Sequence, residues 1–419
     1  MRILYNVLTY VLFLPYIGYW LVRGITNRSY LQRIGERIGI GYPRLERSIW
    51  IHAVSVGEVV AAVPLIRALA KRYPGRPLLV TTVTPTGAAR VASIFGDDVH
   101  HTYIPFEAPT VVNRFFSATN PEIALVLETE IWPNLYRGCG VRGIPLVLVS
   151  ARISPKSVRS YRRLLPLFRE TLSHGIIIAA QSEADAKRFL SLGAAPERTR
   201  VTGNIKFDVE LPPDLSDRGR ELHAELFGER PVWIAASTHE GEEEIVVEAQ
   251  RMLLETHPDL LLVLVPRHPQ RFAAVREMVV KQGMSVVSRT DGEPCSADTQ
   301  VFLGDTMGEL TLFYAASDVA FVAGSLVPIG GHNLLEPAAL GLPLLSGPYI
   351  FNAQEIADMF VTRGACKLVR DAAELAAAVD GLLSDPETAS RLGAAGREIL
   401  ERNRGSLARL MAMIEPLVA

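Results

Sequence analysis

Short apolar runs alternate with longer amphipathic stretches over most of the chain. The runs are rich in Val, Ile and Leu and nearly continuous in hydrophobicity, which is typical of parallel strands buried on both faces. A helical pattern, such as that of residues 58–73, lies between successive runs. This alternation predicts parallel sheets flanked by helices. In the first half, the predicted strands are residues 48–53, 78–83, 123–128, 145–150 and 175–180.

Two prolines and many charged residues interrupt the alternation at residues 208–220, which predicts a linker. The pattern then restarts, with predicted strands at 231–237, 260–266, 299–304, 318–324 and 341–347. We therefore predict an α/β fold of two Rossmann-like, doubly wound domains that face each other across a cleft. The predicted parts are a membrane anchor at 1–24, a first domain at 25–208, a linker at 209–220 and a second domain at 221–419.

The anchor is predicted from residues 3–22, which carry no charge and match the roughly 20 residues that cross a bilayer core. The arginines that follow, among them Arg23 and Arg28, predict that the rest of the chain lies on the cytoplasmic side. A cleaved signal peptide is the alternative, although no small-x-small cleavage site precedes these arginines. Pro15 leaves open whether a retained anchor spans the membrane or lies kinked and half-inserted in one leaflet.

Composition excludes several classes of protein. The 419 residues are 48% hydrophobic and 21% charged, so the chain is globular, and a formal net charge of −2 gives no reason to expect a nucleic-acid partner. Three distant cysteines indicate neither a disulfide framework nor a zinc site. No G-x-x-x-x-G-K-[ST] loop and no Asp-x-Asp motif occurs, so we expect no metal site.

In the second half, small, polar and charged residues follow four predicted strands. Ligands of doubly wound sheets bind beyond the carboxyl ends of the strands, so we expect one binding rim here. Arg267 could bind a phosphate or a sugar carboxylate, and a helix starting at Asn333 could hold one phosphate without metal. The alternative for the second motif is a glycine-rich turn followed by an ordinary first-turn glutamate. The candidate residues are Ser237, Thr238, His239, Pro266, Arg267, His268, Met307, Gly308, Glu309, Gly330, Gly331, Asn333, Leu334, Leu335 and Glu336.

The first half has a similar predicted rim. A serine near a histidine suggests a hydrolase, but no G-x-S-x-G motif is present. Lys206, just before the linker, could neutralise a leaving phosphate, or it could be an ordinary surface lysine. The residues at the strand ends are His52, Ser55, Gly57, Glu58, Glu128, Glu130 and Arg152.

A basic stretch follows Arg152 and has apolar residues interleaved. It predicts either a surface for anionic lipid or a solvated helix face. Its cations are Lys156, Arg159, Arg162, Arg163 and Arg169, and its apolar residues are Leu164, Leu165, Leu167 and Phe168.

Taken in order, six segments of the chain resemble the Kdo transferase family of lipopolysaccharide assembly, where Kdo is 3-deoxy-D-manno-octulosonic acid. They are residues 35–37, 52–58, 128–134, 203–208, 266–268 and 331–337. The resemblance implies a GT-B glycosyltransferase fold, CMP-Kdo as donor and the tetra-acylated lipid A precursor lipid IV(A) as acceptor. It also implies inversion at the anomeric carbon, no metal and no cofactor, and a place at the cytoplasmic face of the bacterial inner membrane.

By matching motif, Glu36 is implied as the general base. Lys206 and either Glu130 or Glu128 are implied as transition-state stabilisers, and the second-half rim is implied to bind CMP-Kdo. The first-half residues around His52, together with Arg152, are assigned to the acceptor side. The number of Kdo units added stays open.

Two other functions are kept as hypotheses. A UDP-sugar 2-epimerase would share the glycine-rich and glutamate elements of the second half, and CMP against UDP in a binding assay would separate the two. The other is a non-catalytic membrane scaffold that keeps a transferase fold, and loss of product in Glu36→Ala with CMP binding retained would exclude it.

Overall fold

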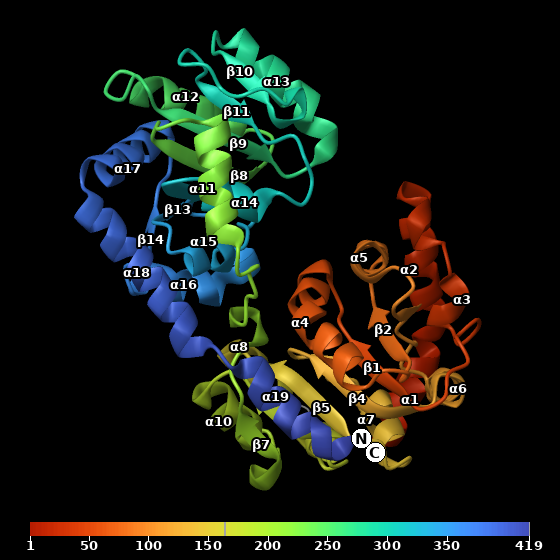
Figure 1. The fold of residues 1–419 in the computed structure, drawn as a ribbon. Helices are drawn as coiled ribbons and strands as arrows, with labels where there is room; N and C mark the ends of the chain where they lie inside the picture. The colour runs from red at the N-terminus through yellow and green to blue at the C-terminus, as the bar shows by residue number, and fades with distance from the viewer. Residues whose placement is uncertain (163–164, 419) are drawn as a thin grey trace. The chain divides into compact units, whose positions relative to one another are not determined.

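Two parallel sheets, one in each half of the chain, organise the protein (Figure 1). The structure is a computed structural model that describes residues 1–162 and 165–418. The first unit consists of Met1–Asp208 together with Asn403–Ala419, and the second of Val209–Arg402.

The first unit is built on a parallel sheet with the order β3-β2-β1-β4-β5-β6-β7 among the residues described. Strand order reverses between β1 and β4, so the loops after these two strands diverge and leave room for a ligand. The strands are β1 (Ser48–His52), β2 (Leu78–Thr82), β3 (His100–Tyr103), β4 (Pro121–Leu127), β5 (Leu146–Ala151), β6 (Ile177–Ala180) and β7 (Thr199–Val201).

Helices cover both faces of this sheet because its central strands are apolar on both sides. One core cluster joins the sheet to α4 (Val56–Arg72), α5 (Pro85–Phe95) and α19 (Ser406–Ile414). The cluster on the opposite face contains residues of α6 (Pro109–Thr119), α7 (Pro133–Gly140), α8 (Pro155–Arg162), α9 (Leu165–Leu172) and α10 (Glu183–Ser191).

The second unit repeats the design with the strand order β10-β11-β9-β8-β12-β13-β14, and all of its pairs are parallel. The reversal of strand order lies here between β8 and β12. The strands are β8 (Val232–Thr238), β9 (Leu261–Pro266), β10 (Val286–Ser288), β11 (Val301–Leu303), β12 (Val319–Val322), β13 (Leu344–Ser346) and β14 (Cys366–Leu368).

Two groups of helices accompany this second sheet. One core cluster joins the sheet to α12 (Glu243–Leu253), α13 (Phe272–Lys281) and α17 (Ala372–Ser384). Elsewhere Gly219 of α11 (Leu215–Leu226) packs so closely on α14 (Leu310–Ala315) that an added Cβ would lie 2.5 Å from Ala315. The remaining helices are α15 (Leu335–Leu340), α16 (Gln354–Thr362) and α18 (Pro386–Asn403).

All ten predicted strands are present, and the four strands that the sequence pattern missed are the edges of the two sheets. β3 and β7 flank the first sheet, and β10 and β14 flank the second. An edge strand is covered less completely than a central one, so it needs no continuous apolar run. β3, for example, begins with two histidines.

The predicted division of the chain differs from the structure at its C-terminal end. Residues 403–418 were assigned to the second domain, but Leu410 and Ile414 of α19 are buried in the core of the first unit. In Figure 1 this blue helix lies near β5. The linker in the structure is also shorter than the predicted 209–220, because α11 already begins at Leu215.

The N-terminal segment forms two helices, α1 (Arg2–Val11) and α2 (Phe13–Thr26), which bend by 42° at Leu12. Pro15 has no N–H to bond the carbonyl four residues earlier, at Val11, which explains the bend. Over the part of the chain that is described, no single helix has the length and apolar character to cross a membrane. The bent pair meets those criteria only when its two helices are taken together.

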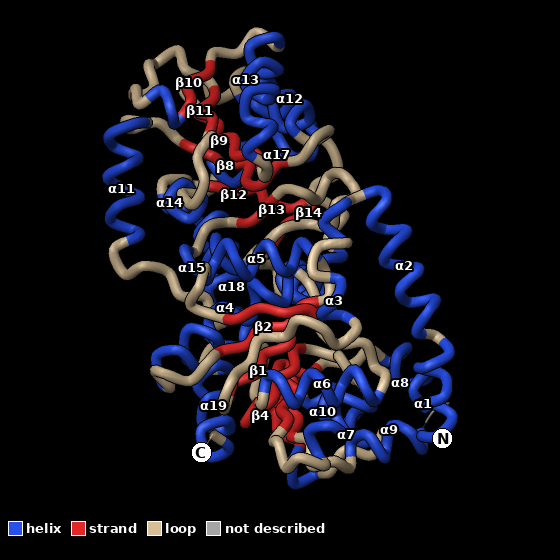
Figure 2. The backbone as a smooth tube through the Cα atoms, turned by 90° about the vertical axis from the view of Figure 1, so that its right-hand side faces the viewer, coloured by secondary structure: helices blue, strands red, loops and turns tan. Residues whose placement is uncertain are grey.

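The same helices pack along the first unit (Figure 2). The Tyr5 hydroxyl donates to Glu107 at 2.8 Å, and the Arg2 guanidinium lies 3.2 Å from Glu170. The ring of Tyr16 lies 4.4 Å from that of Phe106, centroid to centroid. The outward side is apolar and exposed, with large side chains at Ile3, Leu4, Val7, Val11, Leu14, Val22 and Ile25.

Candidate active site

Glu36 lies in the short helix α3 (Ile34–Arg37), and its carboxylate binds the carboxyl end of edge strand β3. One oxygen accepts hydrogen bonds from the Thr102 hydroxyl and the Tyr103 amide, both at 2.9 Å. The other oxygen pairs with the Arg33 guanidinium at 2.6 Å. Because three donors hold the carboxylate and the residue is 7% exposed, its orientation is well defined.

A second cluster of charged groups lies where the strand order of the first sheet reverses. Glu128, directly after β4, pairs with Lys206 at 2.7 Å through one oxygen and with Arg152 at 3.0 Å through the other. Burial alone would raise the pKa of the Glu128 carboxyl, but the charges and hydrogen bonds of Lys206 and Arg152 together lower it below its ordinary value. Glu128 is therefore an anion with both oxygens occupied.

Glu130 and Glu58 adjoin this cluster, and the pKa values of their carboxyls are raised, whereas that of Glu128 is lowered. Burial raises the pKa of Glu130, the nearby Glu128 charge raises it further, and the 2.8 Å hydrogen bond from the Trp132 indole lowers it. Burial raises the pKa of Glu58 to about 7, against a hydrogen bond from the Val54 amide, and the Glu128 and Glu130 charges add to the rise. Carboxyls with raised pKa values are candidates for proton transfer near neutral pH.

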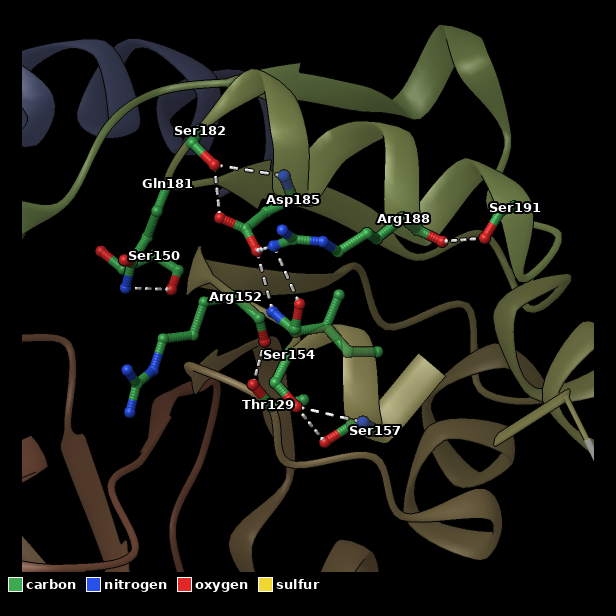
Figure 3. Close-up of polar contacts among 11 residues, drawn as sticks. Thr129, Ser150, Arg152, Ser154, Ser157, Gln181, Ser182, Asp185, Arg188 and Ser191 are labelled. Carbon is green, nitrogen blue, oxygen red and sulfur yellow. Dashed lines mark hydrogen bonds and ion pairs between the residues drawn. The ribbon is translucent and has the colours of Figure 1, made fainter. Parts of the chain in front are cut away.

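The Arg152 side chain is aimed at this cluster by a polar network that holds its own loop (Figure 3). The Ile153 amide donates to Asp185 at 3.0 Å, and Arg188 donates to the Ile153 carbonyl at 3.1 Å. The Arg152 carbonyl accepts a hydrogen bond from Thr129, which follows Glu128. Figure 3 shows the Arg152 guanidinium pointing away from the Asp185 network.

The segment that carries Lys206 is equally restrained. Its Asn204 side chain accepts the Lys206 amide at 3.0 Å, and the Ile205 amide donates to Ser150 at 3.2 Å. Asp208 accepts the amides of Gly405 at 2.6 Å and Leu407 at 2.5 Å, so the C-terminal helix supports the same segment.

Glu36 and the Glu128 cluster share one edge of the sheet without touching. Three strand spacings separate β3 from β4, which is about 14 Å. The structure therefore brings Glu58, Glu128, Glu130, Arg152 and Lys206 together and places Glu36 separately along the same rim.

Three residues expected on the acceptor side, His52, Ser55 and Gly57, contribute to the fold of the first unit. His52 is 1% exposed and hydrogen-bonded through Nδ1 to the Thr81 hydroxyl at 2.9 Å, and burial lowers its pKa to about 4. Ser55 is the N-cap of α4, and Gly57 lies in the first turn of that helix. In the basic stretch Leu167 and Phe168 are buried while the described cations are exposed, which fits a solvated helix face, and a surface for anionic lipid stays a prediction. Arg163 and Leu164 lie outside the described residues.

In the second unit, the predicted rim is present, because β11, β9, β8 and β12 are neighbours in the sheet. A pair of histidines lies at the reversal of strand order. Nε2 of His239 lies 2.9 Å from Nε2 of His332, and the rings are stacked at an 8° interplanar angle. Burial lowers the pKa of His332 to about 4, and the charges of His239, Arg267 and His268 lower it further. Burial also lowers the pKa of His239, and a ring-to-ring hydrogen bond requires that one of the two Nε2 atoms be unprotonated to accept it.

The sequence analysis missed Glu242, which holds the two loops of this rim together. It is fully buried and accepts backbone amides of Gly324, Ser325 and Leu326 from the loop after β12, at 2.7 to 2.8 Å. It also accepts the His239 amide at 3.1 Å. The sequence contained a signal for this role, because a glutamate three residues after the histidine that directly follows a strand suits capping.

Arg267 follows β9, and its amide donates to the Thr238 carbonyl at 3.0 Å. Within the described residues its guanidinium has no hydrogen bond or ion pair, so it is available for an anion. Glu309 is not available in the same way, because both of its oxygens accept hydrogen bonds from the Arg289 guanidinium, at 3.0 and 3.2 Å. Met307, beside it, is exposed, whereas Ser237 and Thr238 are buried.

The glycine-rich loop before α15 lines a pocket, although several of its groups are already bonded within the protein. The amides of Gly330 and Gly331 both donate to the Gly324 carbonyl, at 3.1 and 2.7 Å. The helix begins at Leu335, two residues later than predicted, and Asn333 accepts the Leu335 amide at 3.1 Å. Burial raises the pKa of Glu336, which accepts a 3.1 Å hydrogen bond from the Asn333 amide group. The buried Leu334 and Leu335 contribute packing, and the pocket is lined by Gly330, Gly331, Asn333, Leu334, Ser346 and Ile350.

Across residues 1–162 and 165–418, no group of three or more His, Cys, Asp or Glu side chains is arranged to hold a metal ion. The expectation that neither metal nor cofactor takes part stays a prediction.

The architecture and the comparison with known families together define a class of protein. Two doubly wound parallel sheets with polar rims match the GT-B arrangement, and residues 229–399 match the model of glycosyl transferases group 1. The protein is therefore a glycosyltransferase of the GT-B fold.

The first half narrows the class, since residues 32–209 match the model described as 3-deoxy-D-manno-octulosonic-acid transferase. A 3-deoxy-D-manno-octulosonic acid transferase of Haemophilus influenzae is 42% identical over 410 residues, which cover 97% of this chain and 95% of the relative. The chain belongs to the Kdo transferase family.

Two solved structures are also similar. The C-terminal CMP-Kdo binding domain of WaaA from Acinetobacter baumannii is 38% identical, with a TM-score of 0.44, and the match covers 45% of this chain and 98% of that one. A UDP-GlcNAc 2-epimerase of Neisseria meningitidis is 16% identical with a TM-score of 0.52, covering 84% and 98% of the two chains. At that identity the epimerase shares the fold alone.

Proposed function

We propose that this protein transfers Kdo from CMP-Kdo to lipid IV(A) at the cytoplasmic face of the bacterial inner membrane, with inversion and without a metal. The observation that carries the proposal is the 42% identity to a Kdo transferase over 97% of the chain. The charged groups at the switch point of the first unit support it, because they suit the departure of a phosphate.

In this proposal, Glu36 is the general base. An acceptor hydroxyl oxygen forms a bond to the anomeric carbon of Kdo, and the bond from that carbon to the CMP phosphate oxygen breaks. The hydroxyl proton goes to Glu36, and CMP leaves as a phosphate monoester. Attack from the side opposite the leaving group inverts the anomeric centre.

Lys206 supplies positive charge for the phosphate that develops in this step. Glu128 orients Lys206 through their 2.7 Å ion pair, and Arg152 holds Glu128 in place. Glu130, whose pKa burial raises, is the second carboxyl available for proton movement. His52, Ser55, Gly57 and Glu58 shape the loop that supports this cluster.

The second unit is proposed to bind the donor. Arg267 has a guanidinium without a protein partner among the described residues, and such a group binds a phosphate or the Kdo carboxylate by paired hydrogen bonds. Glu336 can accept hydrogen bonds from ribose hydroxyls. His239 and His332 lie at the switch point, where ligands of doubly wound sheets bind.

The membrane part of the proposal rests on two neighbouring surfaces of the first unit. The outward side of α1 and α2 exposes large apolar side chains, including Ile3 at 82% and Ile25 at 83%. Lys156, Arg159 and Arg162 are exposed on α8, and α1 is tied to neighbouring α9 by the Arg2–Glu170 ion pair. An apolar helix face beside basic residues binds the interface of a membrane that contains anionic lipid.

The test is a transfer assay read by mass spectrometry. Purified, detergent-solubilised protein is incubated with lipid IV(A) and freshly generated CMP-Kdo. We expect the lipid mass to increase in whole Kdo steps, and the number of steps gives the number of units added. No increase, with folded protein and intact substrates, would overturn the proposal.

Two variants make the test specific. Glu36→Gln removes the proposed base and should abolish transfer while CMP binding is kept. Glu46→Gln is the matched control, because Glu46 is an exposed carboxylate of the same unit, and it should be fully active. Transfer by Glu36→Gln at the wild-type rate would exclude Glu36 as the base.

A further inference from the structure

The segment around Glu36 contains an arginine that is buried without a carboxylate partner. Arg37 is 0% exposed, and among the described residues its side chain donates a hydrogen bond to the Val83 carbonyl at 2.7 Å. Its Nε and Nη1 atoms have no partner among the described residues. A buried cation needs compensation from its surroundings.

Two aromatic rings supply that compensation from opposite elements. The guanidinium carbon of Arg37 lies 3.8 Å from the ring centroid of Trp20 in α2 and 3.9 Å from that of Tyr103 in β3. Arginine stacks well on aromatic faces because its guanidinium is planar. Arg37 is therefore held between the N-terminal helix and the strand end that binds Glu36.

The stack continues directly to the carboxylate. The Tyr103 amide donates to Glu36 at 2.9 Å, and the Thr102 hydroxyl donates to the same oxygen at 2.9 Å. Trp20, Arg37, Tyr103 and Glu36 thus form an unbroken series of contacts. A shift of the Trp20 ring would release one side of the Arg37 guanidinium and, through Tyr103, loosen a donor to Glu36.

The N-terminal helices are themselves firmly seated on this region. Gly24 of α2 packs so closely on Leu31 that an added Cβ would lie 2.3 Å from it. The Phe106 amide donates to the Arg37 carbonyl at 2.8 Å, and the Phe106 ring contacts Tyr16 of α2. The next residue, Glu107, binds the Tyr5 hydroxyl of α1 and the Asn134 amide at the start of α7, both at 2.8 Å.

We propose that Trp20 is a positioning residue for the transfer reaction, acting on Glu36 through Arg37 and Tyr103. The N-terminal helices then do more than attach the protein to a membrane, because they complete the support of the base. This inference rests on the proposed role of Glu36, and it adds that turnover depends on Trp20 even when the acceptor is delivered without a bilayer.

The first experiment separates positioning from attachment. Trp20→Ala, Trp20→Phe and the control Leu14→Ala are assayed in detergent micelles with CMP-Kdo and lipid acceptor. Leu14 lies on the same helix and is 75% exposed, so its truncation removes apolar surface without touching the stack. We expect Trp20→Ala to lower kcat about 10- to 100-fold with the KM for CMP-Kdo unchanged, because small misplacements of catalytic groups cost this much. Trp20→Phe keeps a ring and should restore most of the rate.

Two outcomes of that assay would overturn the proposal. One is an unchanged kcat in Trp20→Ala. The other is a loss confined to the KM for the lipid, equal to that of Leu14→Ala, which would mean that Trp20 serves attachment alone.

The second experiment does not require activity. Hydrogen exchange of the Tyr103 amide, the donor to Glu36, is measured in the same variants. We expect faster exchange in Trp20→Ala than in the wild type and Leu14→Ala, with the melting of the second unit unchanged. Equal exchange in all three proteins would exclude the link. Failure of the proposed function would be seen separately, as the absence of any Kdo product from the wild type.

Discussion

The Lys206 ammonium lies 2.7 Å from one oxygen of Glu128, whose other oxygen is 3.0 Å from the Arg152 guanidinium. Two cations thus share one carboxylate, and the group keeps a net positive charge at the switch point of the first sheet. This arrangement orients Lys206 and leaves Glu128 without a free oxygen. Glu128 differs in this from Glu130, whose carboxylate accepts a hydrogen bond from the Trp132 indole and pairs with neither cation among the described residues.

The first prediction concerns Lys206. Lys206→Ala should lower kcat about 10²- to 10³-fold, because a preorganised charge on the leaving group is lost. The KM for the lipid acceptor should change little. Lys187→Ala, an exposed lysine on α10 of the same unit, should have wild-type kcat and serves as the control. A kcat within threefold of wild type would show that Lys206 is a surface lysine.

The second prediction separates Glu128 from Glu130 by the pH dependence of kcat. Burial raises the pKa of Glu130, whereas Lys206 and Arg152 lower that of Glu128 against the effect of burial. Glu130→Gln should therefore remove a titration from the acid limb of the profile, while Glu128→Gln should lower kcat and leave that titration in place. If Glu128→Gln removed this titration and Glu130→Gln left it in place, Glu128 would be the titrating carboxyl.

The third prediction concerns stability and pH. The pKa of Glu58 is about 7 in the folded protein and 4.5 in the unfolded chain. Between these values the folded state binds more protons, so the free energy of unfolding falls as pH rises from about 4.5 to about 7. The contribution is at most about 3.5 kcal/mol, since one pKa unit corresponds to about 1.4 kcal/mol.

Glu58→Gln should therefore gain stability relative to wild type as the pH rises from 5 to 8, measured by urea unfolding at each pH. Glu46→Gln is the control, because Glu46 is exposed, and its difference from wild type should not vary with pH. A difference for Glu58→Gln that is equally flat would mean that Glu58 is charged in the folded protein at pH 5.

The fourth prediction uses two glycines with similar φ angles. Gly324 has a φ of 69°, and a Cβ there would lie 2.7 Å from the His332 ring, whereas Gly228 has a φ of 74° and open space. Each alanine variant should cost about 1 kcal/mol for the positive φ. Only Gly324→Ala should displace His332, and we expect about tenfold weaker CMP binding by calorimetry. Equal CMP affinity in both variants would place the histidine pair outside the nucleotide site.

The fifth prediction concerns the start of α19. Asp208 accepts two amides there, so Asp208→Ala should lower the free energy of unfolding by about 1 to 2 kcal/mol. Asp214→Ala is the control, because Asp214 precedes α11 without a side-chain capping bond and should cost less than about 0.5 kcal/mol. Equal losses in denaturant unfolding would contradict the capping role.

The central strands and the two rims were predictable because they depend on local pattern. A buried parallel strand is apolar throughout, and polar residues directly after it must lie at the carboxyl edge, so the pattern of residues 48–58 is enough to place Glu58. Edge strands such as β3 lack that pattern. The strand that binds Glu36 was therefore missed.

Other features depend on contacts between distant segments. The assignment of α19 to the first unit follows from packing of Leu410 and Ile414, which a reading along the chain cannot anticipate. The same is true of Glu242, three of whose partners lie more than eighty residues away, and of the Arg37 stack, which joins three separate elements. Glu309 was expected to be available for a ligand, but Arg289 occupies it.

The capping of α19 by Asp208 has a consequence for how this chain can be divided. The chain leaves the first unit after Asp208 and returns at Asn403, so the second unit is an insertion within the first. The two ends of the insertion meet, since Asp208 bonds the Gly405 amide at 2.6 Å. A few residues would suffice to join them, whereas a truncation at residue 402 would remove a helix from the first core. Production of the first unit by itself therefore requires that the second unit be excised and the two flanking segments be joined.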